Sequence, residues 1–78
     1  MNKRRFKTID VRPILAQGGE PCDHIFSMIE TLRASDGLSV IAPFLPSPLI
    51  ERLGSQGFQS RVERRADGSW VTHFWRDE

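Results

Sequence analysis

Cysteine is nearly absent from this sequence, and long hydrophobic runs are absent altogether. The one cysteine, Cys22, cannot form an intrachain disulfide, which is consistent with a reducing compartment. No segment approaches the roughly 18 apolar residues that a membrane-spanning helix needs. The basic N-terminus is not followed by the apolar stretch of a signal peptide. We therefore expect a cytoplasmic protein that does not enter a membrane.

The sequence also lacks the motifs of common catalytic sites. It contains no P-loop, no dinucleotide-binding fingerprint, no serine-nucleophile motif and no zinc-ligand spacing. With 78 residues it is one domain. A domain of this size buries only about 60% of its unfolded surface, which leaves little core to support a catalytic pocket. We expect a non-catalytic protein that uses no cofactor and no metal.

Charge is balanced overall but unevenly placed. The first seven positions hold four basic residues and no acidic ones: Lys3, Arg4, Arg5 and Lys7. Because the whole chain carries +1, the other residues carry a net −3. A total so close to zero argues against a nucleic-acid partner. We predict a flexible basic arm over residues 1–6 and a single domain over residues 7–76.

Alternating apolar residues predict four strands. The first covers residues 7–12, and the second runs from Leu38 to the residue before Pro43. The third and fourth cover residues 58–65 and 69–76. Ala66–Asp67–Gly68 lies between them, and its Asp-Gly pair predicts a hairpin, because both turn positions can take positive φ.

Two helices separate the strands. Pro21 suits the first position of a helix over residues 21–34, whose apolar residues form one stripe. Ser47 is a good N-cap for a second helix that begins at Pro48 and ends near Gly57. The segment between the first strand and the first helix, ILAQGG, is predicted to be a loop.

The resulting order, βαβαββ, predicts a two-layer α/β sandwich. Right-handed crossovers place both helices on one face of the sheet. Strand alternation then assigns these residues to the helix-covered face: Ile9, Val11, Leu38, Val40, Ala42, Val62, Trp70 and Phe74. The other face is open.

Several motifs in this order resemble a known family. They are IDVRPIL, GGEPCDHIF, the turn at Gly37, APFLPSPL, QGF and SWVTHFWR. Together they resemble domain-of-unknown-function family 2249 over about residues 8–76. That family is similar in fold to the TusA/SirA-like sulfur-transfer proteins. The resemblance implies a four-stranded mixed sheet of order 1-2-4-3, with the last strand antiparallel.

In the sulfur-transfer proteins a Cys-Pro-x-Pro motif opens the first helix, and its cysteine carries a persulfide. Here Cys22 follows Pro21 instead of preceding it. A thiol in the first turn of a helix is favoured as thiolate by the helix dipole. However, the residues three, four and seven positions later are all apolar, which is typical of a buried stripe, and Glu20 and Asp23 oppose thiolate formation. Both interpretations, a working thiol and a packing residue, stay open.

Two further features suggest sites. Asp10 and Arg12 lie side by side near the end of the first strand, where we expect a structural pair. The open face of the sheet is predicted to carry an apolar group with a basic rim: Ile41, Val71, His73 and Trp75, with Arg12, Arg61 and Arg65 around them. Tryptophan and arginine are enriched in interface hot spots.

We therefore expect a small module that contacts another protein through the open face or the start of the first helix. Weak self-association through the open face is compatible with this. One alternative is a persulfide carrier or redox thiol at Cys22. Another is a module that binds single-stranded RNA on the sheet.

Overall fold

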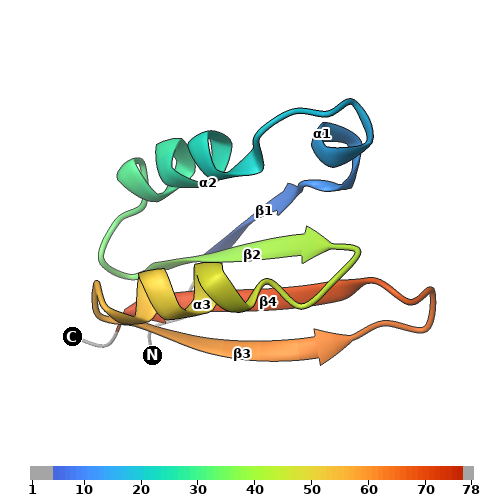
Figure 1. Ribbon diagram of the computed structural model, residues 1–78. Coiled ribbons are helices and arrows are strands. Elements are labelled where there is room, and N and C mark those ends of the chain that lie inside the picture. Colours follow the sequence, from blue (N-terminus) through green and yellow to red (C-terminus); the bar gives the residue numbers. More distant parts are fainter. Residues whose placement is uncertain (1–4, 77–78) are drawn as a thin grey trace.

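The structure of the protein, a computed structural model, describes residues 5–76. It has seven elements: β1 (Arg5–Asp10), α1 (Arg12–Ala16), α2 (Pro21–Glu30), β2 (Asp36–Ala42), α3 (Ser47–Gly54), β3 (Phe58–Arg64) and β4 (Trp70–Arg76). The strands form one four-stranded sheet of order β1-β2-β4-β3 (Figure 1). β1 and β2 are parallel, and β4 is antiparallel to both of its neighbours. The predicted α/β fold and its sheet order are confirmed.

The ends of most elements differ by a few residues from the sequence-based prediction; β2, for example, begins at Asp36 and not at Leu38, and α3 ends at Gly54 and not near Gly57. β1 begins at Arg5 and ends at Asp10, so it includes the last two residues of the expected basic arm. The remainder of that arm, residues 1–4, lies outside the described residues. α2 ends at Glu30, because the hydroxyl of Thr31 donates to the carbonyl of Met28 at 2.7 Å and closes the last turn.

The loop predicted before α2 contains a helix instead. α1 spans five residues, with Val11 as N-cap and Pro13 in its first turn. A helix this short has too few residues to show a helical period in the sequence. Similarly, Ser47 is not an N-cap: Pro46 holds that position and Ser47 is already helical.

The hairpin between β3 and β4 is also built differently. Gly68 has φ of +87°, whereas no residue other than glycine has positive φ among the residues described. The Gly68 N–H donates to the Arg65 carbonyl at 3.0 Å, and the Arg65 N–H donates to the Ser69 carbonyl at 2.8 Å. This is the three-residue loop Ala66–Asp67–Gly68 that the sequence predicts, but only its glycine is in the left-handed conformation, whereas the prediction of positive φ at Asp67 is wrong.

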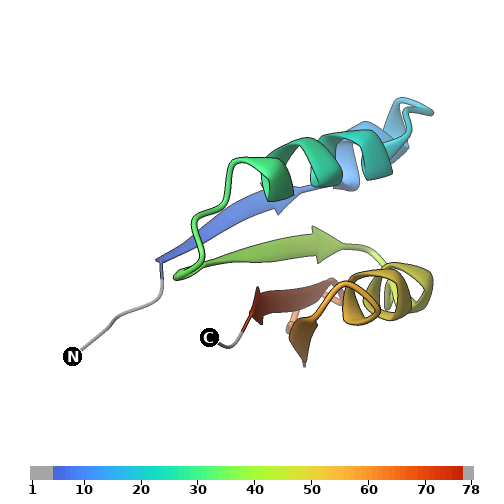
Figure 2. The same ribbon diagram turned by 90° about the vertical axis from the view of Figure 1, so that its left-hand side faces the viewer.

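The core lies between the sheet and the two longer helices. It is built from these strand and helix residues: Leu38, Val40, Ala42, Phe58 and Phe74, together with Val11, Ile25, Ile29, Leu49 and Leu53. Phe74 and Leu38 are fully buried opposite each other on β4 and β2. Each such side chain stabilises the fold by about 1.5–3 kcal/mol. Because α2 and α3 contribute to one cluster, the sheet has one covered face and one open face, and Figure 2 shows α2 lying along β1.

Trp70 is an exception to the predicted core. It begins β4 on the covered side, but it is half-buried and lies outside the core cluster. The guanidinium of Arg64 lies 5.4 Å above its ring. Arginine can cover an aromatic face in this way at the margin of a sheet.

Within residues 5–76, no helix has the length and apolar character to cross a bilayer.

Candidate interaction surface and the Cys22 cavity

The open face of the sheet is arranged in three rows that cross all four strands. The strand register places Asp10, Ile41, Val71 and Glu63 in one row, Thr8, Ser39, His73 and Arg61 in the next, and Phe6, Gly37, Trp75 and Gln59 in the third. Each row combines residues that are far apart in the sequence. The predicted group of Ile41, Val71, His73 and Trp75 therefore lies on one face.

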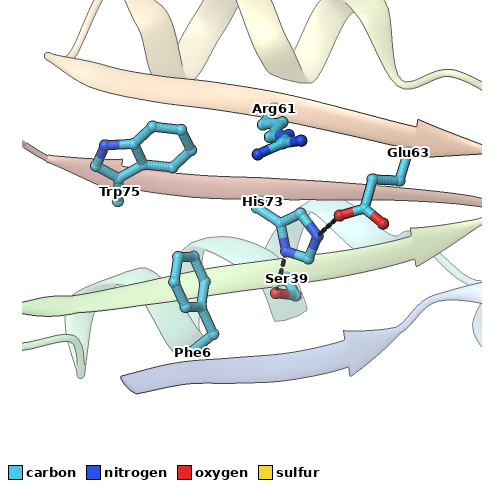
Figure 3. A pocket seen from close by; sticks show the side chains of 6 residues that line it. All are labelled: Phe6, Ser39, Arg61, Glu63, His73 and Trp75. Carbon is cyan, nitrogen blue, oxygen red and sulfur yellow. Dashed lines mark hydrogen bonds and ion pairs between the residues drawn. The ribbon is translucent and has the colours of Figure 1, made fainter. Parts of the chain in front are cut away.

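A pit of about 390 Å³ lies in the middle of this face (Figure 3). It is lined by Phe6, Ser39, Arg61, Glu63, His73 and Trp75. The Phe6 residue is 41% exposed, so its ring is accessible at the edge of the pit. Its ring meets His73 edge-on, with the ring centroids 5.6 Å apart. The pit thus has three rings from two strands around it.

Gly37 makes the position of the Phe6 ring possible. A Cβ at Gly37 would lie 2.4 Å from one ring carbon of Phe6 and 2.8 Å from the carbonyl oxygen of Phe74. Real Cβ atoms do not approach other atoms this closely, so any other residue here would displace the Phe6 ring or the β4 backbone. Glycine in a strand often marks such a close approach.

The floor of the pit is a chain of hydrogen bonds across three strands. The Ser39 hydroxyl lies 2.7 Å from Nδ1 of His73, and Nε2 of His73 lies 3.0 Å from a carboxylate oxygen of Glu63. Ser39 is buried, and the His73 side chain is 27% exposed. The chain fixes the imidazole in one orientation, with its edge towards Phe6.

Ser39, His73 and Glu63 are the residue types of a hydrolytic triad, but their setting is not that of one. Ser39 lies in the middle of β2, where the peptide N–H groups lie in the plane of the sheet and bond to the neighbouring strands. The strands around the pit therefore offer no pair of N–H groups for an oxyanion. The pit offers aromatic surface, one imidazole and one guanidinium to a ligand.

The three arginines predicted to rim the open face differ in their partners. Arg61 lines the pit, and no ion pair involves its guanidinium within the described part of the chain. Arg12 instead lies at the carboxyl end of β1, where it binds Asp10 at 2.8 Å and Asp67 at 3.4 Å. Arg65 is exposed at the β3–β4 hairpin, near the same carboxylates.

Asp10 and Arg12 form the expected structural pair. The Asp10 carboxylate accepts hydrogen bonds from the backbone N–H and from Nε and Nη2 of Arg12, at 3.0, 3.0 and 2.8 Å. These bonds hold the pKa of Asp10 below its ordinary value. Asp67 accepts from the hydroxyl and N–H of Ser69, which also lowers the pKa of its carboxyl. The pair thereby ties the end of β1 to the hairpin.

Cys22 is in the first turn of α2, as the sequence predicted, and is partly buried. Glu20 is the N-cap, and its carboxylate accepts from the Cys22 N–H at 3.0 Å. Burial raises the pKa of the Cys22 thiol above its ordinary value, and the neighbouring Glu20 carboxylate raises it further. Both effects favour the neutral thiol over the reactive thiolate.

The thiol borders a small apolar cavity of about 170 Å³. The cavity lies between the starts of α2 and α3, at the carboxyl end of β2. Its lining is nearly all apolar: Val11, Pro21, Cys22, Ile25, Val40, Ala42, Phe44, Pro46, Pro48 and Leu49. No group of three metal-ligating side chains occurs in the part of the chain that the structure describes.

The sequence-based prediction does not include Phe6 in the surface, because it assigns residues 1–6 to a basic arm. The signal was nevertheless present: extending the alternation of the first strand backwards from Asp10 through Thr8 places Phe6 on the same face. The start of β1 is therefore part of the candidate surface.

The fold and this surface can be set against known proteins. Residues 8–76 match the family described as "Uncharacterized conserved protein (DUF2249)". The match covers most of the chain, so the chain belongs to this family. No curated protein and no solved structure matches the chain.

Proposed function

We propose that the protein is a small non-catalytic binding module that contacts another protein through the open face of its sheet. The observation that carries this proposal is the pit, because its lining combines Phe6, His73 and Trp75 with the guanidinium of Arg61. Aromatic side chains and arginine dominate the binding energy of protein interfaces, and they do so most strongly around a central pocket. A cytoplasmic location belongs to the same proposal and rests on the single cysteine.

Sulfur carriage by Cys22 is less well supported than protein binding. A persulfide carrier needs a thiolate that a partner can reach. The raised pKa of Cys22, its partial burial and the adjacent Glu20 carboxylate all work against that requirement.

Position-specific photo-crosslinking in the cells that make the protein tests the proposal. Thr8, which is exposed beside the pit in the row of Ser39 and His73, would be replaced by a benzophenone-bearing residue, and the same residue would replace Glu30 on the helix-covered side as a control. We expect a covalent adduct with another protein from position 8 and none from position 30. Added wild-type protein should compete for the adduct, whereas a Trp75→Ser competitor should not.

The other outcomes contradict the proposal. An adduct formed only with a second copy of the chain would assign the face to self-association. An adduct formed only with RNA would assign it to the nucleic-acid alternative, for which Phe6 and Trp75 would be the stacking rings. Equal adducts from positions 8 and 30 would show that the open face is not a specific site.

A further inference from the structure

β1 is an edge strand with an exposed surface. It is the outermost strand beside β2, and residues 5–8 are all exposed. An edge strand presents backbone N–H and C=O groups that have no partner strand on one side. An extended peptide can add to such an edge through main-chain hydrogen bonds, while its side chains give specificity.

Three cations surround one side of this edge. A hollow of about 570 Å³ is lined by Arg5 and Lys7 of β1, by Asp36 at the start of β2, and by Thr31, Arg33 and Ser35 of the segment between α2 and β2. Within residues 5–76, no ion pair involves Arg5, Lys7 or Arg33. Among the described residues, the Lys7 ammonium donates a hydrogen bond only to the hydroxyl of Thr31, at 3.2 Å. The charge of the hollow is therefore available to an outside carboxylate.

The one carboxylate in the hollow does not neutralise these cations. Asp36, the first residue of β2, accepts a hydrogen bond from the backbone N–H of Arg33 at 3.2 Å, which holds its carboxylate against the turn before the strand. The three cations and the one carboxylate give the lining of the hollow a net charge of +2. An approaching acidic group would meet a net positive field that is screened only by salt.

The opposite side of the same strand is apolar. Successive strand residues point to opposite faces, so Phe6 lies on the open face while Arg5 and Lys7 lie towards the hollow. A strand added beside β1 would alternate in the same way. Its residues on one side would meet the cations, and those on the other side would meet Phe6 at the rim of the pit.

We propose that the outer edge of β1 binds an extended, acidic segment of a protein partner by strand addition. Acidic side chains of the segment pair with Arg5, Lys7 and Arg33, and the alternate apolar side chains pack on Phe6. This inference rests on the proposed function, since it names the kind of segment that the partner presents. Charge complementarity selects an acidic segment and the free strand edge selects an extended one.

The test uses a fluorescein-labelled peptide of alternating glutamate and valine, measured by fluorescence anisotropy with the full chain. We expect saturable binding that weakens as salt is added. We also expect Lys7→Glu and Arg33→Glu to weaken the binding by about tenfold or more, because each replaces attraction by repulsion. Arg64→Glu makes the same change of charge on the other edge strand and should leave the affinity unchanged. Because Arg33 lies in a loop, that variant still tests the proposal if Lys7→Glu does not fold.

Three control ligands separate strand addition from simple charge attraction. The same peptide with N-methylated backbone at alternate positions lacks the N–H donors of a strand and should not bind. A lysine–valine peptide and a single-stranded oligothymidylate should not bind either. Hydrogen exchange should show that backbone amides of β1 become protected when the glutamate–valine peptide binds, and that those of β3 do not.

Several results would overturn the inference. One is equal affinity for the N-methylated and unmodified peptides. Another is unchanged affinity in both Lys7→Glu and Arg33→Glu, and a third is tighter binding of the oligonucleotide than of the peptide. If no peptide binds but the adduct at position 8 still forms, the edge-strand inference fails and the open-face function stands. If neither occurs, both fail.

Discussion

The charged side chains at the two ends of β1 differ in whether they form ion pairs within the chain. At its carboxyl end, Asp10 and Arg12 bind each other and reach Asp67 in the distant hairpin, so the charges there are matched within the chain. At its amino end, Arg5 and Lys7 have no carboxylate partner within residues 5–76. Matched charges hold elements together, whereas unmatched charges on an exposed edge are available to a partner. Asp10 and Arg12 therefore stabilise the fold, whereas Arg5 and Lys7 can contact a partner.

The aromatic residues follow the same division. Phe74, in the middle of β4, is fully buried and serves the core, whereas Phe6 at the amino end of β1 is 41% exposed. Phe6 nevertheless has a defined place, because Gly37 leaves room for its ring and His73 meets that ring edge-on. An exposed but well-positioned ring is what a binding surface requires, since little side-chain entropy is then lost on binding.

The largest expected effect on stability comes from Gly37→Ala, which disturbs the packing at the amino end of β1. The new methyl group would collide with the Phe6 ring and with the Phe74 carbonyl oxygen, and a backbone atom cannot move aside as a side chain can. We expect a loss of about 2–3 kcal/mol in the free energy of unfolding, measured with urea. Gly54→Ala is the control, because a Cβ there meets nothing within 4 Å. Equal stability of Gly37→Ala and the wild type would mean that Phe6 does not pack over Gly37.

The next largest effect on stability concerns the Asp10–Arg12 pair at the carboxyl end of β1. The pKa of Asp10 is lowered by its hydrogen bonds to Arg12, so its contribution to stability is present above the unfolded-state pKa and is lost as the pH falls through the lower, folded-state pKa. At neutral pH, Asp10→Asn should lower the free energy of unfolding by about 1–2 kcal/mol, the smaller figure being favoured by solvent contact. The difference from the wild type should shrink as the pH falls below about 4.

Urea unfolding across a pH series measures this difference. Glu51→Gln removes an exposed carboxylate from α3 and controls for the general effect of charge. A deficit in Asp10→Asn that stays constant down to strongly acidic pH would show that the Asp10 charge contributes nothing, and that only the geometry of the side chain matters.

Cys22 borders the cavity at the carboxyl end of β2, which is parallel to β1, so it lies at the same edge of the sheet as the carboxyl end of β1. Its replacement is predicted to have a smaller effect on stability. Because its thiol is partly buried beside the apolar cavity, Cys22→Ala should cost about 1 kcal/mol. The raised pKa of Cys22 predicts slow alkylation of the native protein at neutral pH, slower than that of an unstructured cysteine peptide. The rate should increase at alkaline pH and on unfolding. Faster alkylation of the folded protein than of the peptide would revive the carrier interpretation of Cys22.

The sequence predicted the parts of the fold that depend on periodicity. Strand alternation placed Leu38 and Phe74 in the core and His73 and Trp75 on the open face, and the neighbouring Asp10 and Arg12 were recognised as a pair. The failures have local causes. α1 is too short for a helical period, and Thr31 ends α2 through a hydroxyl–carbonyl bond that a pattern of apolar residues does not reveal.

The pit is formed by side chains from segments that are far apart in the sequence, and the contacts between those segments could not be predicted from the sequence. The hydrogen-bond chain joins Ser39, His73 and Glu63 only because β2, β4 and β3 lie in that register. The packing of Phe6 over Gly37 needs the parallel pairing of β1 with β2. Trp70 was expected in the core from alternation alone, but alternation gives the face of the sheet and not how far the helices extend over it.

The smallest expected effect is that of Lys7→Gln, and it tests the amino end directly. Lys7 makes one exposed hydrogen bond to Thr31 and no ion pair within the described residues, so its removal should change the free energy of unfolding by no more than about 0.5 kcal/mol. Since Lys7 lies beside Arg5 and Arg33, the lost hydrogen bond is offset by weaker repulsion among the cations. Added salt screens that repulsion, so the wild type should gain more stability from salt than Lys7→Gln does. Urea unfolding at low and high salt measures both quantities. If Lys7→Gln proves as destabilising as Asp10→Asn, the cations of the amino end are structural, and the edge of β1 has no spare charge to offer an acidic partner.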